Sequence, residues 1–127
     1  NPHCVVFKTA GQFWSREDLL KLGPALENHP FFPKRTNVQL AVPTGPKELF
    51  ILIWERGAGE TQASGSSSCA AASAAVRLGL VKSPITVKMP GGSLNIEVAA
   101  DFSLTMKGPV AEVARGSLSP SFVRGLR

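Results

Sequence analysis

A segment in the middle of the chain combines residue types that can bind a small charged molecule. It reads WERGAGETQASGSSS, residues 54–68, and passes from an apolar run through glycines into a helix of small residues. Glu55 and Arg56 end the apolar run, where a fixed pair of opposite charges can orient a zwitterion. Gly65 and Ser66 stand where the helix begins, and free amides at a helix N-terminus favour a carboxylate or phosphate. The segment therefore predicts a binding site for a small anion or zwitterion.

The same residue types also have ordinary structural roles. Glu55 and Arg56 could form a simple ion pair, and the serines between Ser64 and Ser68 could cap the helix. His3, taken alone, is more typical of a strand end whose ring is satisfied by hydrogen bonds. The residue types by themselves leave both interpretations open.

The elements around this segment predict an α+β fold in a single domain. A helix over residues 66–78 is apolar on nearly every side, which predicts burial on all sides. A second helix is expected after Ser15, with Gly23-Pro24 ending or kinking it. Alternating or apolar runs predict seven strands, at residues 4–8, 37–42, 49–54, 85–89, 94–98, 102–107 and 110–114. The simplest arrangement is an antiparallel sheet or barrel wrapped around a central buried helix.

Composition predicts a single domain and argues against nucleic-acid, metal and membrane partners. The 127 residues are enough for one core, and the net charge of +5 comes from cations spread evenly along the chain. Without a basic stripe, nucleic acid is not an expected partner. Cys4 and Cys69 are far apart and lack metal-ligand spacing, so neither a metal site nor a disulfide framework is predicted. Free thiols and the lack of an apolar run of membrane-spanning length predict a cytoplasmic chain without a membrane partner.

The first residues predict that the chain is part of something longer. NPHCVVF places a turn dipeptide, Asn1-Pro2, directly before a strand with no lead-in. The final residues, 116–127, have little pattern and are expected to fray or to pack against a neighbour outside this chain.

Four stretches, in order, resemble the C-terminal half of the diaminopimelate epimerase family. They are NPHCVVF, LGPALENHPFFPKRTNV, WERGAGETQASGSSSCAAA and PGGSLNIEV, and the resemblance covers Asn1 to about Gly116. It implies a cofactor-independent (PLP-independent) isomerase that converts LL- to meso-diaminopimelate for lysine and peptidoglycan precursors. It also implies two similar halves, each a barrel-like sheet around a central helix, with the active site between the two helix N-termini.

The resemblance further implies how the reaction proceeds. Each half supplies one cysteine; a thiolate removes the α-proton from one face, and a thiol returns a proton to the other. A thiol suits this work because its pKa, roughly 8.5, can be lowered by a helix N-terminus. The amides at the helix start stabilise the carbanion by binding the adjacent carboxylate.

Most residues of one half-site match the family pattern. Asn1, Asn37 and Arg56 match residues that hold the distal end of diaminopimelate. Gly65 and Ser66 match the amides that bind the carboxylate at the reacting end.

Two further positions match residues close to the chemistry. Glu55 matches a contact near the substrate amine, and His3 matches a neighbour of the catalytic thiols.

Ser64 departs from the pattern, because this position is the catalytic cysteine of the family. A hydroxyl is a far weaker acid than a thiol. The activation free energy of epimerisation is therefore expected to rise by about 3 kcal/mol or more. Cys69 lies one helical turn further on and is expected to be a packing residue. Ser64 is either engineered or natural, and the additional serines at Ser67 and Ser68 favour a natural origin.

Two alternatives to diaminopimelate epimerisation remain. One is a racemase, isomerase or dehydratase on the same scaffold, with Ser64 in place of a thiol; Asn37 and Arg56 argue against it. The other is an amino-acid-binding homologue without catalysis. The expected partners are an amino-acid substrate and the missing N-terminal half, and a homodimer is a further hypothesis because the cleft face would expose apolar surface.

Overall fold

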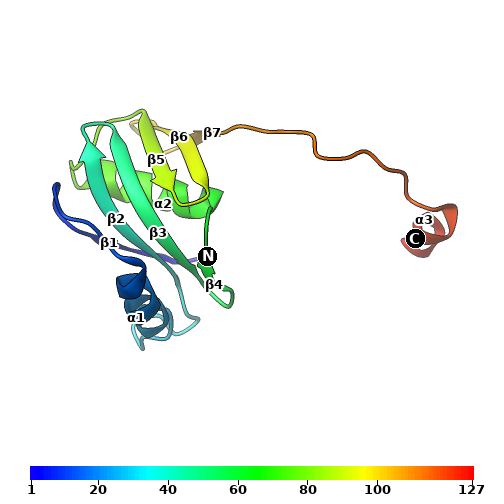
Figure 1. Ribbon diagram of the computed structural model, residues 1–127, viewed down its shortest axis with the longest axis horizontal. Coiled ribbons are helices and arrows are strands. Elements are labelled where there is room, and N and C mark those ends of the chain that lie inside the picture. The colour runs from blue at the N-terminus through cyan, green and yellow to red at the C-terminus, as the bar shows by residue number, and fades with distance from the viewer.

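The computed structural model describes residues 1–127 and shows a seven-stranded sheet with a helix against each face (Figure 1). The strands are β1 (His3–Phe7), β2 (Asn37–Gly45), β3 (Glu48–Glu55), β4 (Gly59–Thr61), β5 (Ile85–Met89), β6 (Gly92–Val98) and β7 (Leu104–Lys107). The helices are α1 (Arg16–Glu27), α2 (Gly65–Arg77) and α3 (Pro120–Gly125). The strand order is β1-β2-β3-β5-β6-β7, and β4 pairs with β3. The predicted α+β class is confirmed.

The sheet is mixed, which corrects the prediction of an antiparallel sheet. β1 and β2 are parallel, with α1 lying between them in the chain, and β3 and β5 are parallel, with α2 between them. Parallel neighbours need a long crossover connection, and the two helices supply it. The remaining pairs are antiparallel.

α1 begins at a capping box and runs past its proline. The Ser15 side chain accepts a hydrogen bond from the Asp18 amide, and the Asp18 carboxylate accepts one from the Ser15 amide. Gly23-Pro24 does not end the helix, which corrects one of the two predicted outcomes, an end or a kink. Gly23 instead lets the helix approach the sheet, because a Cβ there would lie 2.6 Å from the Trp54 ring. α1 thereby covers a small core that contains Leu19.

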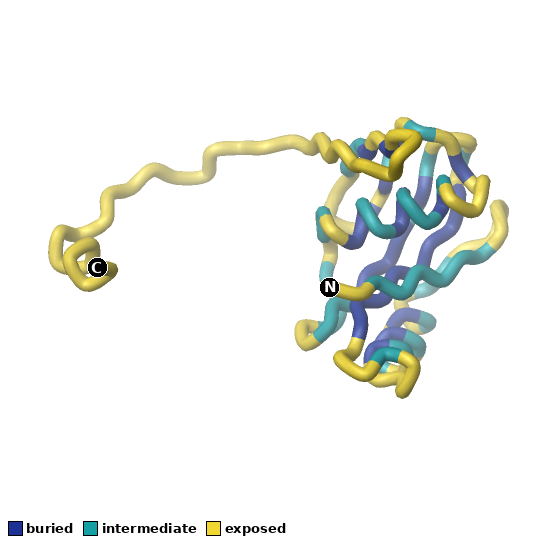
Figure 2. Tube along the Cα trace, turned by 180° about the vertical axis from the view of Figure 1, so that it is seen from behind, coloured by how far each residue is buried: buried dark blue, intermediate teal, exposed yellow.

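α2 packs along the other face of the sheet through alanines. Ala71, Ala72 and Ala75 are fully buried in a core with residues of β2, β3, β5 and β6. Its outer side, which carries Ala70, Ser73 and Ala74, is only half-buried (Figure 2). The prediction of burial on all sides is therefore wrong for this chain, because no strand within residues 1–127 covers that side. None of the helices has the length and hydropathy needed to cross a bilayer.

The end of the chain lies apart from the sheet. The predicted strand at residues 110–114 is absent, and every residue from 99 onward is exposed (Figure 2). Residues 110–114 pair with no strand, although β7 forms an edge of the sheet, and the apolar side chains of Val110 and Val113 remain 96% and 95% exposed. The short β4 and the terminal α3 are elements that the sequence patterns did not predict.

Removing residues 111–127 is expected to leave the thermal stability of this chain unchanged, because these residues bury nothing in the core. The measurement is the midpoint of thermal unfolding by circular dichroism. As a control, removal from Ser103 onward also deletes β7 and its pairing with β6 and should lower the midpoint. A lower midpoint after the shorter truncation would contradict the arrangement in Figure 1.

Candidate functional site

The predicted site residues gather at one end of the sheet. β1 and β2 run parallel and both begin there, with His3 paired to Asn37, and β3 ends there at Glu55. The N-terminus, β4 and the start of α2 lie at this same end (Figure 1). Residues far apart in sequence therefore share one surface because of strand direction.

Asn1, Asn37 and Arg56 form one hydrogen-bonded cluster. The Arg56 guanidinium donates from Nη2 to Oδ1 of Asn1 (2.6 Å) and from Nη1 to the Lys34 carbonyl (3.2 Å). The Arg56 amide donates to Oδ1 of Asn37 (2.8 Å), and Asn37 is almost fully buried. The cluster has a half-buried guanidinium on a fixed backbone, which can recognise a carboxylate.

Ser64 is the N-cap of α2. Its Oγ accepts a hydrogen bond from the Ser67 amide (3.3 Å), and its carbonyl accepts one from the Ser68 amide (3.1 Å). Of the four orphan amides at the start of a helix, those of Gly65 and Ser66 remain without an intrahelical acceptor. Ser64 is half-buried and Ser66 is exposed, so an anion can reach these two amides.

Gln39 joins His3 to the start of α2. Its Nε2 donates to Oγ of Ser67 (2.9 Å) and to Nδ1 of His3 (3.1 Å). Because an amide nitrogen only donates, Nδ1 is the acceptor and the neutral ring carries its proton on Nε2. Burial, the largest cause, and the charge of the N-terminus lower the pKa of His3, while the charge of Glu55 opposes that shift. His3 is therefore held, as a neutral imidazole at pH 7, near Ser64, Ser66 and Ser67 at the start of α2, which form the serine cluster.

Glu55 is the last residue of β3 and directly precedes Arg56 in the chain. Its Oε1 accepts a hydrogen bond from the Thr61 hydroxyl of β4 (3.2 Å), and its charge acts on His3. The side chain is half-buried, which leaves the carboxylate able to meet a cationic group of a ligand.

Two hollows adjoin these clusters. One, of about 260 Å³, is lined by Ser64, Gly65 and the β5–β6 turn. The other, of about 440 Å³, is lined by Asn1, Arg56 and the 31–35 loop. A third hollow of about 590 Å³ lies at the opposite end of the sheet, is formed by turns and contains no titratable side chain.

The two cysteines lie outside the serine cluster. Cys69 is half-buried against the larger core, as expected of a packing residue, and Cys4 lies on β1. Burial raises the pKa of both thiols, so neither is activated as a nucleophile. No group of three or more His, Cys, Asp or Glu side chains lies together in a way that could hold a metal ion.

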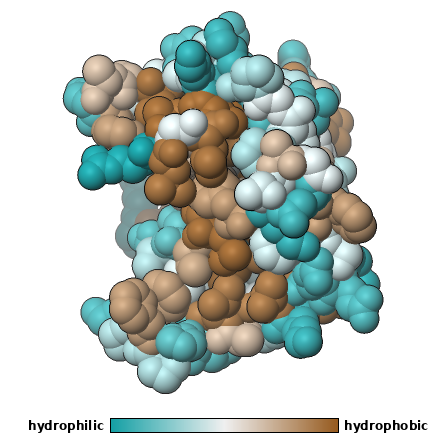
Figure 3. Space-filling view, turned by 90° about the vertical axis from the view of Figure 1, so that its left-hand side faces the viewer, coloured by the Kyte–Doolittle hydropathy of each residue, from teal (hydrophilic) through white to brown (hydrophobic).

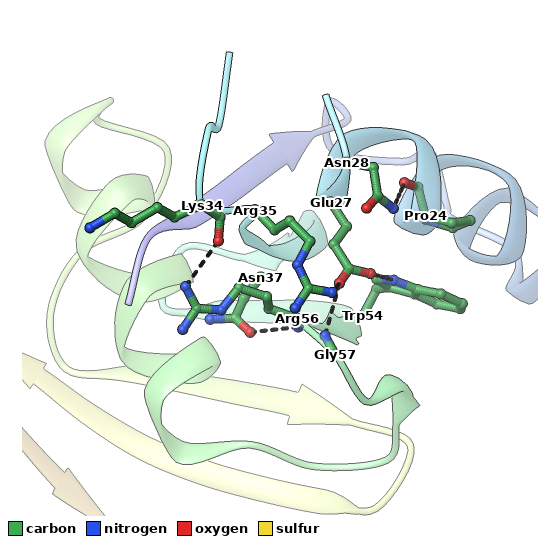
Figure 4. A network of polar contacts seen from close by, with 9 residues as sticks. All are labelled: Pro24, Glu27, Asn28, Lys34, Arg35, Asn37, Trp54, Arg56 and Gly57. Atoms are coloured by element: carbon green, nitrogen blue, oxygen red, sulfur yellow. Dashed lines mark hydrogen bonds and ion pairs between the residues drawn. The ribbon is translucent and has the colours of Figure 1, made fainter. Parts of the chain in front are cut away.

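Glu27 is a residue of this region that the sequence patterns did not single out. Its carboxylate is almost fully buried and accepts hydrogen bonds from Trp54 Nε1, the Gly57 amide and Arg35 Nη1, at 2.8, 2.8 and 3.0 Å (Figure 4). These bonds, that of Trp54 foremost, lower the pKa of Glu27. The available signal was an acidic residue at the C-terminal end of a predicted helix, where the helix dipole disfavours it.

The profile of the family "Diaminopimelate epimerase" matches residues 1–113. This chain belongs to the diaminopimelate epimerase family. The relatives in this family are similar along nearly its whole length. A diaminopimelate epimerase of Desulfitobacterium hafniense is 44% identical over 118 residues, which are 93% of this chain. Diaminopimelate epimerase 2 of a Nostoc species is 47% identical over 94% of this chain, and the enzyme of Methylorubrum populi is 42% identical over 99%.

The chain spans about two fifths of the length of these family members, 41%, 41% and 42% respectively. A solved structure of a Bacillus anthracis phenazine biosynthesis protein of the PhzF family has a similar fold. The TM-score is 0.53 at 12% identity, over 73% of this chain and 30% of that protein. This likeness concerns the fold alone.

Gly91→Ala is expected to destabilise the site end of the sheet. A Cβ at Gly91 would lie 2.9 Å from the Gln62 carbonyl oxygen and 3.2 Å from Cβ of Ala63, so the loop before Ser64 would have to shift. We expect the free energy of unfolding in urea to fall by about 1–3 kcal/mol. Gly45→Ala, whose Cβ would make an ordinary 3.6 Å contact, is the matched control. Equal effects of the two substitutions would contradict this account.

Glu27 is expected to make stability depend on pH in the acidic range. Its pKa is lower in the folded chain than its ordinary value of 4.5, so its stabilisation is complete above pH 4.5 and is lost as the pH falls further. At pH 7, Glu27→Gln should lower the free energy of unfolding in urea by about 2 kcal/mol or more. That difference from wild type should shrink below pH 4.5.

Glu17→Gln, exposed in the first turn of the same helix, is the control and should lower the free energy of unfolding at pH 7 by no more than about 1 kcal/mol, through its interaction with the helix dipole. A Glu27→Gln deficit that stays constant between pH 7 and pH 3 would show that the charge of Glu27 is not what stabilises the fold.

Proposed function

We propose that this chain forms one half of the active site of a cofactor-independent epimerase that converts LL- to meso-diaminopimelate in the cytoplasm, for lysine and peptidoglycan precursors. The observation that carries the proposal is the pairing, at one sheet end, of the Asn1–Asn37–Arg56 cluster with the free amides of Gly65 and Ser66. Diaminopimelate has an amino-acid group at each end, and the two clusters offer one polar site for each.

In the proposed complex, the Arg56 cluster holds the distal end of the substrate. The planar guanidinium binds the distal carboxylate, and Oδ1 of Asn1, which already accepts from Arg56, is available to the distal ammonium group. Asn37 is buried and bonded to the Arg56 amide, so it fixes the backbone on which the guanidinium is carried.

The reacting end lies at the start of α2. The amides of Gly65 and Ser66 bind the α-carboxylate, and Glu55 binds the α-ammonium group. When a base removes the α-proton, negative charge spreads into the carboxylate, and the two amides and the helix dipole stabilise it. An acid on the opposite face then returns a proton to carbon and inverts the centre.

Ser64 stands on one of these faces and is better placed to donate a proton than to accept one. Its oxygen already accepts from the Ser67 amide, and its one other side-chain contact is with Oγ of Ser66 at 3.4 Å, in which either hydroxyl can donate. A hydroxyl is not ionised near neutral pH, so removal of the α-proton falls to a thiol of the other half. The expected result is hydrogen exchange from one face with impaired inversion.

A second candidate is an amino-acid-binding homologue without catalysis. The observation in its favour is the N-cap role of Ser64, since serine is among the best N-cap residues. A residue retained only to cap the helix would leave the binding clusters intact and the acid–base chemistry absent.

The rest of the protein is proposed to complete both the fold and the site. Figure 3 shows a band of apolar side chains on the side of the molecule that carries the free edge of β1. The outer side of α2 is half-buried, and Leu78 and Leu80 at its end are 63% and 40% exposed. Further strands over these surfaces would give the barrel around a central helix, and a similar N-terminal half would face Ser64. Self-association into a homodimer is a further hypothesis for the same apolar surface.

The full-length protein, incubated with diaminopimelate stereoisomers in heavy water, is expected to exchange the α-hydrogen while inverting the centre slowly. Ser64→Cys should raise the rate of inversion by about 100-fold or more, because a second thiol restores the acid–base partner on this face. Deuterium at the α-carbon is followed by mass spectrometry and inversion by chiral chromatography.

Ser64→Ala is the matched control and should keep exchange while losing the remaining inversion. Binding of diaminopimelate without exchange, in wild type and in Ser64→Cys, would support the non-catalytic homologue. Neither binding nor exchange would overturn the proposed substrate.

A further inference from the structure

We propose that Glu27 is a positioning residue that holds Arg56 in place for the distal end of the substrate. The inference rests on the proposed function for its substrate, and on the contacts of one buried carboxylate for its geometry. Glu27 is the last residue of α1 and does not itself reach the site surface.

The Glu27 carboxylate ties together the two segments that contact Arg56. Oε1 accepts hydrogen bonds from the Gly57 amide (2.8 Å) and from Arg35 Nη1 (3.0 Å). Gly57 follows Arg56 in the chain, and Arg35 follows Lys34, whose carbonyl accepts from the Arg56 guanidinium. One oxygen atom therefore holds both the backbone that carries Arg56 and the loop that orients its side chain (Figure 4).

Both segments have backbone conformations that need support. Gly57 has φ of +77° and Arg35 has φ of +63°, a value that is uncommon for a residue with a side chain. The Arg35 side chain is held by Glu27 alone among the side chains, and its amide donates to the Phe32 carbonyl (2.8 Å). Without Glu27, the 31–35 loop and the turn after β3 lose their common anchor.

The location of Glu27 is electrostatically unfavourable for the helix itself. An acidic side chain at the C-terminal end of α1 faces the negative end of the helix dipole, and no basic residue lies in that last turn. The carboxylate is also withdrawn from water, with 8% of its side chain exposed. Its three donors offset this cost, and two of them belong to the segments around Arg56.

Glutamine cannot reproduce this arrangement. Three donors converge on the carboxylate, whereas an amide has a single oxygen and two N–H groups of its own. In Glu27→Gln at least one donor would therefore face an N–H group, and the turn would loosen. Contacts to the distal end are the same in the bound and the reacting substrate, so their loss should raise KM and leave kcat nearly unchanged.

The test measures amide hydrogen exchange and kinetics on the full-length protein. Glu27→Gln is expected to increase exchange of residues 55–59 by about tenfold or more and to raise KM for α-hydrogen exchange of diaminopimelate by about tenfold, with kcat within about twofold of wild type. Glu17→Gln, exposed on the same helix, should match wild type in both measurements.

Trp54→Phe separates positioning from stability. It removes only the donor to Oε2 and part of the ring, so it should lower stability while residues 55–59 keep their protection and KM stays near the wild-type value. If Trp54→Phe raises KM as much as Glu27→Gln does, the rise in KM comes from lost stability and not from lost positioning of Arg56. That result would overturn the proposal.

Unchanged amide exchange in Glu27→Gln would also overturn the proposal, whatever the substrate. Faster amide exchange with an unchanged KM would show that Glu27 holds the turn but does not serve the site, which again overturns it. If the wild-type protein does not act on diaminopimelate, the proposed function fails, and this failure is distinct from that of the Glu27 proposal. In that case the dissociation constant of the amino acid that binds replaces KM in the comparison of the variants.

Discussion

Close packing of α2 on the sheet is the constraint on which the site depends. Ala71, Ala72 and Ala75 have no exposed surface, and side chains of this size allow the helix backbone to approach the strands. The helix start is thereby fixed against Gln39 of β2, which donates to Ser67, and against Met89 at the end of β5, which contacts Ser68. A larger residue on this side would push Gly65 and Ser66 away from the Arg56 cluster, and the two ends of a ligand would no longer fit together.

Buried polar side chains supply the fine positioning at this sheet end. Gln39 is fully buried and connects His3 to Ser67, although its Oε1 has no hydrogen-bond partner. Such an orphan atom costs about 1–3 kcal/mol. Glu27 makes the corresponding connection on the other face of the sheet, where α1 packs. The two networks fix the imidazole and the guanidinium from opposite faces, so neither depends on a surface loop alone.

Ser64 is a better helix cap than a cysteine would be, but a weaker acid–base group. As an N-cap it satisfies an amide of α2 better than a thiol would, since sulfur is a weak acceptor. As an acid–base group it is far weaker than a thiol. The same atom thus stabilises the helix start and limits the acid–base chemistry proposed for it, while the hydrogen bonds of the Asn1–Asn37–Arg56 cluster do not involve Ser64.

The sequence by itself determined the family, the α+β class and most strands, and it predicted which residues form the proposed half-site. Those inferences rest on local patterns: a serine cap, glycines before a small-residue helix, and an Asn, Glu and Arg set in a recognisable order. The capped start of α1 at Ser15 and the start of α2 at Gly65 needed no tertiary information, because capping is a contact within four residues.

Only the tertiary structure decided which residues meet. The parallel pairing of β1 with β2 follows from the crossover through α1, and it places His3 beside Asn37. Pro24 continues α1 because Gly23 packs on Trp54, a contact between residues distant in sequence. Residues 110–114 look like a strand but pair with none, and Glu27 looks like a helix end but accepts hydrogen bonds from three residues outside α1. Strand pairing and buried hydrogen bonds depend on partners elsewhere in the chain, and local sequence patterns do not specify them.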